Sequence, residues 1–259
     1  MEMEWIYLSP HLDDVALSCG GLVWEQSEFG DRTQVWTICA GDPPEHSISS
    51  FAESLHSRWQ ADRQATAQRR LEDQLSCGIM GAETRHFNLP DCIYRLGPPG
   101  THQEGLALYD SEESLWDLPH PAEANLIKNL GDELRAELPE QAEIVCPLSL
   151  GGHVDHRITR QAVESLGFRL WYYPDYPYAL KSQNELHALE REGLQSCVFT
   201  ISERGLQAWI NAVAAHQSQI STFWSIDTHR QVPAIQAMKE AIRSYYEMMG
   251  GVSLWKKQN

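Results

Sequence analysis

The sequence has few basic residues and no long apolar run. Its 20 lysines and arginines stand against 36 aspartates and glutamates, which gives a formal net charge of −16. Nucleic acids and anionic membrane surfaces attract basic faces, so this balance argues against either as a partner. No apolar stretch approaches the roughly 20 residues of a membrane span, and the first residues are acidic where a secretory signal is basic. We therefore expect a cytoplasmic protein without integral membrane association.

The sequence also lacks paired cysteines, linkers and low-complexity tracts. Its six cysteines are spread along the chain, and no C-x-x-C pair indicates a zinc ribbon or a redox site. Most of them are expected to be small, reduced core residues. A chain of 259 residues can bury one sizeable core, so we expect a single domain over 1–259. The sequence does not determine the oligomeric state, and a homo-oligomer is compatible with it.

Apolar, β-branched and aromatic runs alternate with helical patterns along the chain. Strands are predicted at 5–9, 34–40, 84–89, 143–148, 169–173 and 196–202. Helices are predicted at 15–28, 54–77, 121–137 and 156–166, and at 203–222 and 233–248 in a mostly helical C-terminal part. This alternation predicts an α/β fold, with a mostly parallel sheet covered by helices on both faces. In such sheets, ligands bind outside the carboxyl ends of the strands.

Two turns that follow predicted strands are rich in histidine and aspartate. The stretch "SPHLDD" places His11, Asp13 and Asp14 between the first strand and its helix. The stretch "SLGGHVDHR" places His153, Asp155 and His156 after the strand at 143–148. If these strands lie side by side or nearly so, the six side chains gather at one rim of the sheet.

Each element also has a simpler interpretation. A lone histidine can be a hydrogen-bonded residue at a strand end, a lone aspartate can cap a helix, and H-x-x-H occurs by chance. The conjunction of both clusters favours a metal. Two imidazoles and a carboxylate are the ligand set of catalytic zinc, which keeps a position open for water, and no cysteine lies in either turn.

Together, "SPHLDD" followed by a helix and "PLSLGGHVDHR" resemble the PIG-L/LmbE-like family of zinc-dependent de-N-acetylases. Further similarity lies at 69–95, 172–179, 215–224 and 250–256, so the resemblance covers most of the chain in order. It implies a Rossmann-like α/β sandwich, in agreement with the predicted elements. It also implies an enzyme that removes the N-acetyl group from an N-acetylglucosamine-type sugar conjugate.

Carried over residue by residue, the resemblance makes His11, Asp14 and His156 the ligands of Zn²⁺ and Asp13 the general base. The bound ion would lower the pKa of a water molecule to roughly 7 and polarise the amide carbonyl. Protonated His153 would then stabilise the oxyanion or protonate the leaving amine, with Asp155 holding its ring and keeping it cationic.

The chain departs from the family pattern at three positions. Leu12 and Val15 replace the proline and the glutamate of the usual PHPDDE motif. Gly151 stands where some relatives have a tyrosine that is thought to assist. The identity of the general acid is therefore open.

For substrate binding, the resemblance points to Arg69 and Asp91, which would hold sugar hydroxyl groups. Arg70 is an alternative to Arg69. Arg69 could instead form a surface pair with Glu72, and Asp91 could be an ordinary turn residue. The Pro- and Gly-rich segment 90–120 is either a lid over the site or a surface excursion.

Two other functional classes stay open. An Asp-Asp pair after a first strand can hold magnesium in a receiver-like binding module, although the further residues of such a module are not found. Alternatively, this protein is a member of the family that uses its metal to hydrolyse another amide or an ester, or a member that is a catalytically idle scaffold. Leu12, Val15 and Gly151 keep that alternative open.

Overall fold

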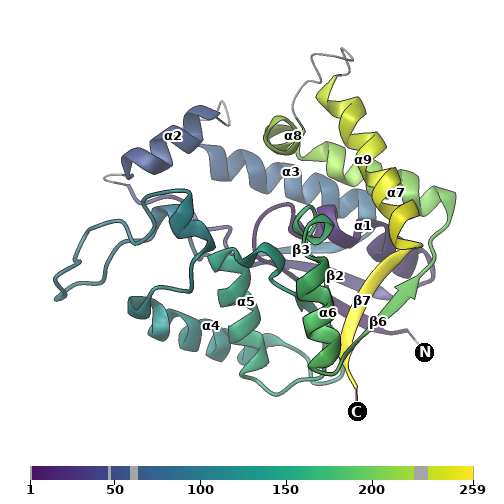
Figure 1. Ribbon diagram of the computed structural model, residues 1–259, viewed down its shortest axis with the longest axis horizontal. Coiled ribbons are helices and arrows are strands. Elements are labelled where there is room, and N and C mark those ends of the chain that lie inside the picture. Colours follow the sequence, from purple (N-terminus) through teal and green to yellow (C-terminus); the bar gives the residue numbers. More distant parts are fainter. Residues whose placement is uncertain (1, 46–47, 59–63, 225–232, 259) are drawn as a thin grey trace.

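The computed structural model describes residues 2–45, 48–58, 64–224 and 233–258 (Figure 1). Its centre is a seven-stranded sheet with the order β3-β2-β1-β4-β5-β7-β6. The strands are β1 (Glu4–Ser9), β2 (Arg32–Thr37), β3 (Glu83–His86), β4 (Glu143–Pro147), β5 (Leu170–Tyr173), β6 (Leu194–Phe199) and β7 (Val252–Lys257). The first five are parallel, and β7 runs antiparallel between β5 and β6. The predicted mostly parallel α/β fold is confirmed, with the 3-2-1-4 strand order of Rossmann-like sheets.

The two strands that precede the histidine-rich turns are neighbours in the middle of this sheet. Residues 5–7 of β1 pair with residues 143–145 of β4 in parallel register. Ile6, Leu8, Ile144 and Val145 are fully buried, as expected for central strands covered on both faces. Because parallel strands end at the same edge of a sheet, the two turns emerge side by side.

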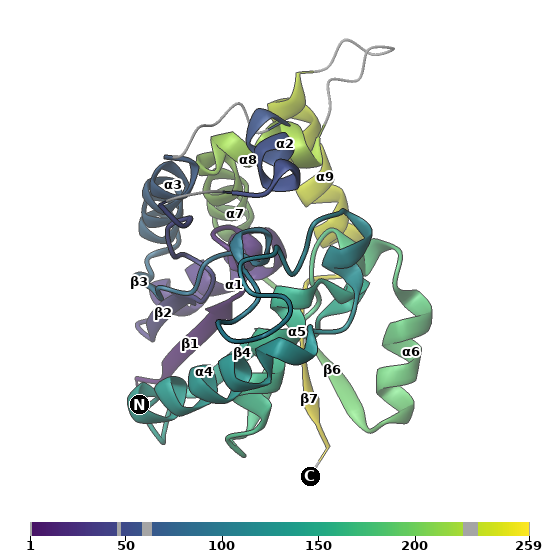
Figure 2. The same ribbon diagram turned by 90° about the vertical axis from the view of Figure 1, so that its left-hand side faces the viewer.

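Helices cover both faces of the sheet, as predicted. Figure 2 shows α1, α3, α7 and α9 on one side and α4 and α5 on the other. The helices are α1 (Asp14–Glu28), α2 (Ser50–Arg58), α3 (Ala65–Met80), α4 (Ala124–Glu137), α5 (Val154–Glu164), α6 (Gln183–Arg191), α7 (Glu203–Ala215), α8 (Gln217–Phe223) and α9 (Ala234–Met249). Among the described residues, no helix is both long enough and apolar enough to cross a bilayer.

Close packing between α1 and α7 fixes the first helix over the sheet. Trp209 of α7 is fully buried, and its indole N–H donates a hydrogen bond to the carbonyl oxygen of Ala16 at 2.7 Å. Gly20 and Gly21 of α1 lie against this ring, and a Cβ atom at Gly21 would come within 3.1 Å of the indole. The two glycines therefore allow the large side chain to approach the helix backbone.

Several predicted boundaries were wrong. The predicted helix 54–77 corresponds to two helices, α2 and α3, between which residues 59–63 lie outside the described part. The predicted helix 203–222 is interrupted at His216, whose φ of −80° and ψ of 59° are not helical. Helix α6 and strand β7 were not predicted.

Segment 90–120 folds across the carboxyl edge of the sheet. It contains the short 3₁₀ turns η1 (Cys92–Tyr94) and η2 (Glu113–Trp116), and a third, η3 (Pro121–Glu123), follows it directly.

All six cysteines are unpaired, and five of them are buried, in line with the expected core role.

Candidate metal centre and active site

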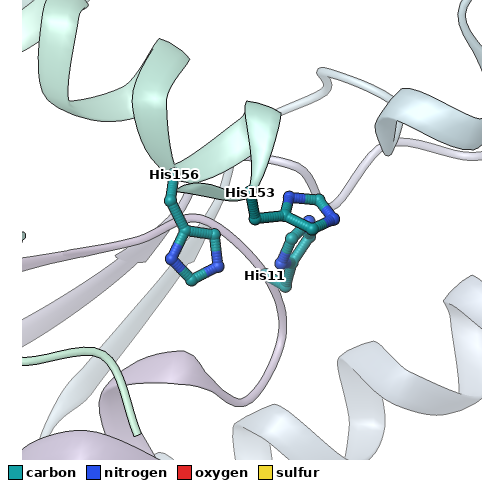
Figure 3. Close-up of side chains that lie close together, drawn as sticks. All are labelled: His11, His153 and His156. Atoms are coloured by element: carbon teal, nitrogen blue, oxygen red, sulfur yellow. The ribbon is translucent and has the colours of Figure 1, made fainter. Parts of the chain in front are cut away.

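Both histidine-rich turns reach the same point above the sheet (Figure 3). His11 follows β1, and Asp14 is the first residue of α1. The hydroxyl of Ser9 holds this turn by donating to the carbonyl oxygen of His11 at 2.6 Å and accepting from the backbone N–H of Val15 at 3.3 Å. His156 lies in the first turn of α5, so a short connection follows each strand and brings its side chains to the edge.

One carboxylate oxygen is shared by two histidines. Oδ2 of Asp14 lies 3.2 Å from Nδ1 of His11 and 3.3 Å from Nε2 of His156. Zinc bonds to nitrogen or carboxylate oxygen of about 2.0–2.1 Å in a tetrahedral arrangement place two ligand atoms roughly 3.3–3.4 Å apart. The Asp14 oxygen and each of the two histidine nitrogens therefore have the spacing of two ligands on one zinc ion, and three such ligands would leave one position for water or substrate.

The other ring nitrogen of each histidine is held by a second carboxylate. Nε2 of His11 lies 3.0 Å from Asp155, and Nδ1 of His156 lies 2.6 Å from Asp175. Such carboxylate–histidine pairs orient metal ligands and fix their tautomers. Asp175 lies in segment 172–179, which resembles the family, but no role was predicted for this residue.

The electrostatics of the three donors are mutually dependent. Burial by itself lowers the pKa of His156, but the Asp14 and Asp175 carboxylates outweigh burial and raise this pKa to about 9. The pKa of His11 is likewise raised, against burial, by Asp14 and Asp155. Burial would raise the pKa of Asp14, yet His156 and His11 hold it well below its usual range. The site thus carries negative charge that attracts protons or a metal cation.

His153 lies beside this donor set. Its ring centroid is 4.8 Å from that of His11 and 5.4 Å from that of His156. His153 is also the N-cap of α5, because its Nδ1 accepts a hydrogen bond from the backbone N–H of Asp155 at 3.2 Å. A neutral ring that accepts at Nδ1 carries its proton on Nε2, so Nε2 is a donor and is not available to a metal.

This geometry corrects the role predicted for Asp155. Its carboxylate contacts His11, Arg95 and the backbone N–H of Cys92, whereas His153 is held by the backbone of Asp155. Burial and the neighbouring His11 hold the pKa of His153 well below its usual range. The Asp155 carboxylate thus holds His11 and not the ring of His153, and the charge of His153 in the reaction stays a prediction.

Asp13 lies on the open side of the site. It is buried, and its carboxylate is 3.5 Å from the guanidinium of Arg69. Burial raises the pKa of Asp13, and the charge of Arg69 opposes that rise. A carboxylate with a raised pKa is a better proton acceptor than an exposed aspartate.

Arg69 and Arg70, the two alternatives for the substrate-binding arginine, lie on different faces of α3. Arg69 points into the site, whereas Arg70 donates to the carbonyl oxygen of Ala40 and to Asp42, away from it. Glu72 does not serve as the surface partner of Arg69. It accepts hydrogen bonds from the backbone N–H and hydroxyl of Ser218, which fasten α8 to α3.

A cavity of about 370 Å³ opens over these groups. Every site residue predicted from the sequence lines it except Asp155, which is fully buried behind His11. Leu115 and Trp116 of segment 90–120 also line the cavity, together with Tyr178, which follows β5. The segment thus forms part of the cavity wall and is not a separate surface excursion.

A buried ion-pair network behind His11 was missed. Arg95 lies 2.6 Å from Asp155 and 2.5 Å from Glu123, and the hydroxyl of Tyr109 donates to Glu123. These contacts join Asp155, behind His11, to the segment that forms the cavity wall. No local pattern marked Arg95 or Glu123, because their partners are distant in sequence.

His216, between α7 and α8, was also missed as a site residue. It is 2% exposed, and among the described residues neither of its ring nitrogens has a hydrogen-bond partner. Its charge is one of those that oppose the raised pKa of Asp13. Its signal in the sequence was its place in segment 215–224, which resembles the family.

Known proteins are similar to this chain in sequence. A 2'-N-acetylparomamine deacetylase of Streptomyces fradiae is 31% identical over 182 residues, which represent 67% of this chain and 57% of that protein. A 2'-N-acetylparomamine deacetylase of Niallia circulans is 27% identical over 191 residues, 67% of each chain. This chain thus matches little more than half the length of the Streptomyces protein.

Solved structures show the same fold. A deacetylase in the biosynthesis pathway of teicoplanin superposes with a TM-score of 0.77 at 21% identity, over 98% of this chain and 97% of that one. The zinc-inhibited form of teicoplanin deacetylase Orf2 superposes with a TM-score of 0.73 at 20% identity, with the same coverage. Residues 6–166 match the PIG-L family, described as GlcNAc-PI de-N-acetylase. Because this match spans both histidine-rich turns and the strands that carry them, the chain belongs to the PIG-L family.

Proposed function

We propose that the protein is a zinc-dependent hydrolase that removes the N-acetyl group from an N-acetylglucosamine-type sugar conjugate. The observation that supports this proposal most strongly is the shared Asp14 oxygen, 3.2 and 3.3 Å from the nitrogens of His11 and His156. The two curated relatives, both named as deacetylases of an N-acetylated compound, favour the same reaction.

His11, Asp14 and His156 would hold the zinc ion. When bound there, zinc supplies a Lewis acid for the amide carbonyl and lowers the pKa of a water molecule to roughly 7. Asp155 and Asp175 keep the two imidazoles in the orientation that this binding needs. This set of two imidazoles and one carboxylate is typical of catalytic zinc, and it argues against the magnesium site of a receiver-like module.

Asp13 is the general base of the proposed reaction. It lines the cavity beside Asp14, and its backbone N–H donates to the carbonyl oxygen of His11 at 2.9 Å, which leaves its carboxylate apart from both imidazole rings. Its carboxylate takes a proton from the attacking water molecule and can return that proton to the nitrogen of the leaving amine. The raised pKa of Asp13 suits both steps, so the proposed reaction needs no cationic histidine as general acid.

His153 serves as a neutral hydrogen-bond donor. Since its Nδ1 accepts from the backbone, its Nε2–H is the group available to the cavity. A donor fixed in this way stabilises the negative charge that develops on the acyl oxygen. Its position as the N-cap of α5 fixes the ring before substrate binds.

Sugar recognition is assigned to Arg69 and Asp91. Both line the cavity, and Arg69 also lies beside Asp13. Asp91 accepts a hydrogen bond from the backbone N–H of Ile93, which fixes its carboxylate at the start of segment 90–120. Charged groups that are fixed in this way can bind sugar hydroxyl groups through directional hydrogen bonds.

The decisive experiment measures the amine released from a panel of N-acetylglucosaminides that differ in the group attached to the sugar. Metal-free protein and protein reloaded with zinc are assayed in parallel. Zinc-dependent release of amine and acetate from at least one sugar supports the proposal. A zinc-loaded protein that hydrolyses only esters or other amides would favour the alternative hydrolase, and one inactive on every compound would favour an idle scaffold.

A further inference from the structure

Tyr178 lies in the cavity although the reaction described above gives it no part. It follows β5, and its ring meets that of the proposed ligand His156 at 6.2 Å and 80°. On its other side it meets Trp116 at 5.3 Å and 69°. The side chain is therefore fixed between a metal ligand and the wall formed by segment 90–120.

The hydroxyl of Tyr178 has no hydrogen-bond partner among the described residues. The hydroxyls of other tyrosines near the site do have partners. The hydroxyl of Tyr173 donates to the carbonyl oxygen of Leu8, and the hydroxyl of Tyr109 donates to Glu123. Enclosed tyrosine hydroxyls usually find such a partner. An unpaired hydroxyl on a side chain that lines the cavity is suited to a group that arrives with the substrate.

The backbone opposite Tyr178 leaves room for its ring. Gly151, in the turn before His153, has a φ of +76°, and a Cβ atom there would lie 2.8 Å from Cγ of Tyr178. A side chain at position 151 and the observed Tyr178 ring therefore exclude each other. The glycine that departs from the family pattern is what admits this tyrosine to the cavity.

We infer that Tyr178 is a further catalytic residue, whose O–H donates a hydrogen bond to the acyl oxygen of the substrate as that oxygen gains negative charge. This inference rests on the proposed deacetylase function. The phenol keeps its proton throughout, because a tyrosine with a pKa of about 10 or higher is protonated near neutrality. Tyr178 and the Nε2–H of His153 then approach the acyl oxygen from two different elements of the fold.

The first test is Tyr178→Phe, which keeps the ring and its packing but removes the donor. Loss of one oxyanion donor lowers kcat by about 10²- to 10³-fold in the best-studied case. Because zinc and His153 share the task here, we expect a fall of about 10- to 100-fold, with KM and zinc content unchanged. The matched control is Tyr176→Phe, in the same segment but outside the cavity lining, which should keep wild-type kcat. Wild-type kcat in Tyr178→Phe would overturn the inference.

A second substrate separates a chemical role from a packing role. An N-trifluoroacetyl sugar carries a more electrophilic carbonyl and depends less on oxyanion donors. The loss of kcat in Tyr178→Phe should therefore shrink by several-fold on this substrate relative to the N-acetyl sugar. An equal loss on both substrates would show that the ring is merely misplaced, and it would reject the hydrogen bond.

A binding measurement keeps this test independent of turnover. Acetohydroxamate binds zinc and places an oxygen where the acyl oxygen would lie. Its Kd for the zinc-loaded protein should rise about tenfold in Tyr178→Phe and stay unchanged in Tyr176→Phe, as expected for one lost hydrogen bond. If the wild-type protein binds acetohydroxamate but deacetylates no sugar, the proposed function fails, and the Kd ratio still decides the position of the hydroxyl. An unchanged Kd in Tyr178→Phe would overturn the inference.

Discussion

The proposed metal side of the cavity and its proposed substrate side are built in different ways. The metal side consists of His11, Asp14 and His156, which follow two central strands, and each imidazole is held on its second nitrogen by a buried carboxylate. The substrate side comes from a helix and from loops. It includes Trp116, which is 40% exposed, and Tyr178, whose hydroxyl has no partner among the described residues.

This contrast follows from what each side must bind. A metal ion needs donors fixed within tenths of an ångström, and the ends of buried strands with paired carboxylates behind them supply that order. A substrate supplies hydrogen-bond partners of its own, so groups that meet it can stay unpaired until it arrives. Variants on the metal side should therefore change metal content, whereas variants on the substrate side should change kcat or KM while the metal remains.

The largest effect is expected from Asp14→Ala. Since one Asp14 oxygen is the atom that both histidine ligands approach, the variant should contain little zinc and have no measurable turnover. Elemental analysis and the amine-release assay on the same preparation test this. Asp42→Ala, at an exposed aspartate that pairs with Arg70, is the matched control and should be fully active. Stoichiometric zinc in Asp14→Ala would refute the ligand set.

The next effect separates chemistry from metal binding. Asp13→Asn keeps the shape of the side chain but cannot accept a proton, so kcat should fall by about 10²- to 10⁴-fold, the usual contribution of a general base. Zinc should remain stoichiometric, because Asp13 is not one of the proposed ligands. Full activity of Asp13→Asn would remove the general-base mechanism, and loss of zinc would exchange the roles of Asp13 and Asp14.

A smaller effect should come from the carboxylate behind His156. Asp175→Asn weakens the hydrogen bond to Nδ1 of His156, so zinc affinity should fall by about 10- to 100-fold, as for other groups that support metal ligands. Competition with a chromophoric chelator measures this change. Arg69→Gln serves as the control on the substrate side, because Arg69 lies beside Asp13, and it should leave zinc affinity unchanged while KM rises. Equal zinc affinities in the two variants would erase the distinction between the sides.

The sequence predicted correctly that the side chains of the proposed metal side lie together, because the signals for this are local. His11, Asp13 and Asp14 lie within four residues of one another. Because parallel strands end at one edge of the sheet, they could be predicted to lie near the turn that contains His153 and His156. The sequence pattern did not predict ion pairs between single residues that lie far apart in the chain. Arg95 and Asp155 are separated by 60 positions, and neither position shows which partner it will meet.

The substrate side was predicted less well for a related reason. Arg69 and Arg70 are adjacent, and only the packing of α3 shows which of them faces the cavity. Gly151 was noted as a departure from the family pattern, but its contact with Tyr178, which follows a different strand, could not be read from the sequence. Strand β7 was missed because it inserts between β5 and β6 out of chain order.

The smallest effect is expected at the exposed wall of the cavity, from Trp116→Ala. Trp116 meets the ring of His153 at 5.2 Å and that of Tyr178 at 5.3 Å, but it contacts no proposed zinc ligand through a hydrogen bond. Removing a partly exposed indole should raise KM by about three- to tenfold, within the range for residues at the rim of a binding site. Zinc content should not change, and steady-state kinetics on the best substrate test this.

Trp116→Phe distinguishes apolar contact with substrate from support of the neighbouring rings. It keeps an aromatic edge against His153 and Tyr178, so kcat should equal that of the wild type, and KM should lie between those of the wild type and Trp116→Ala. If kcat instead falls in Trp116→Ala and recovers in Trp116→Phe, the indole positions His153 or Tyr178 and belongs functionally with the oxyanion donors. If KM is unchanged in both variants, segment 90–120 encloses the cavity without binding substrate, and the substrate side narrows to Arg69, Asp91 and Tyr178.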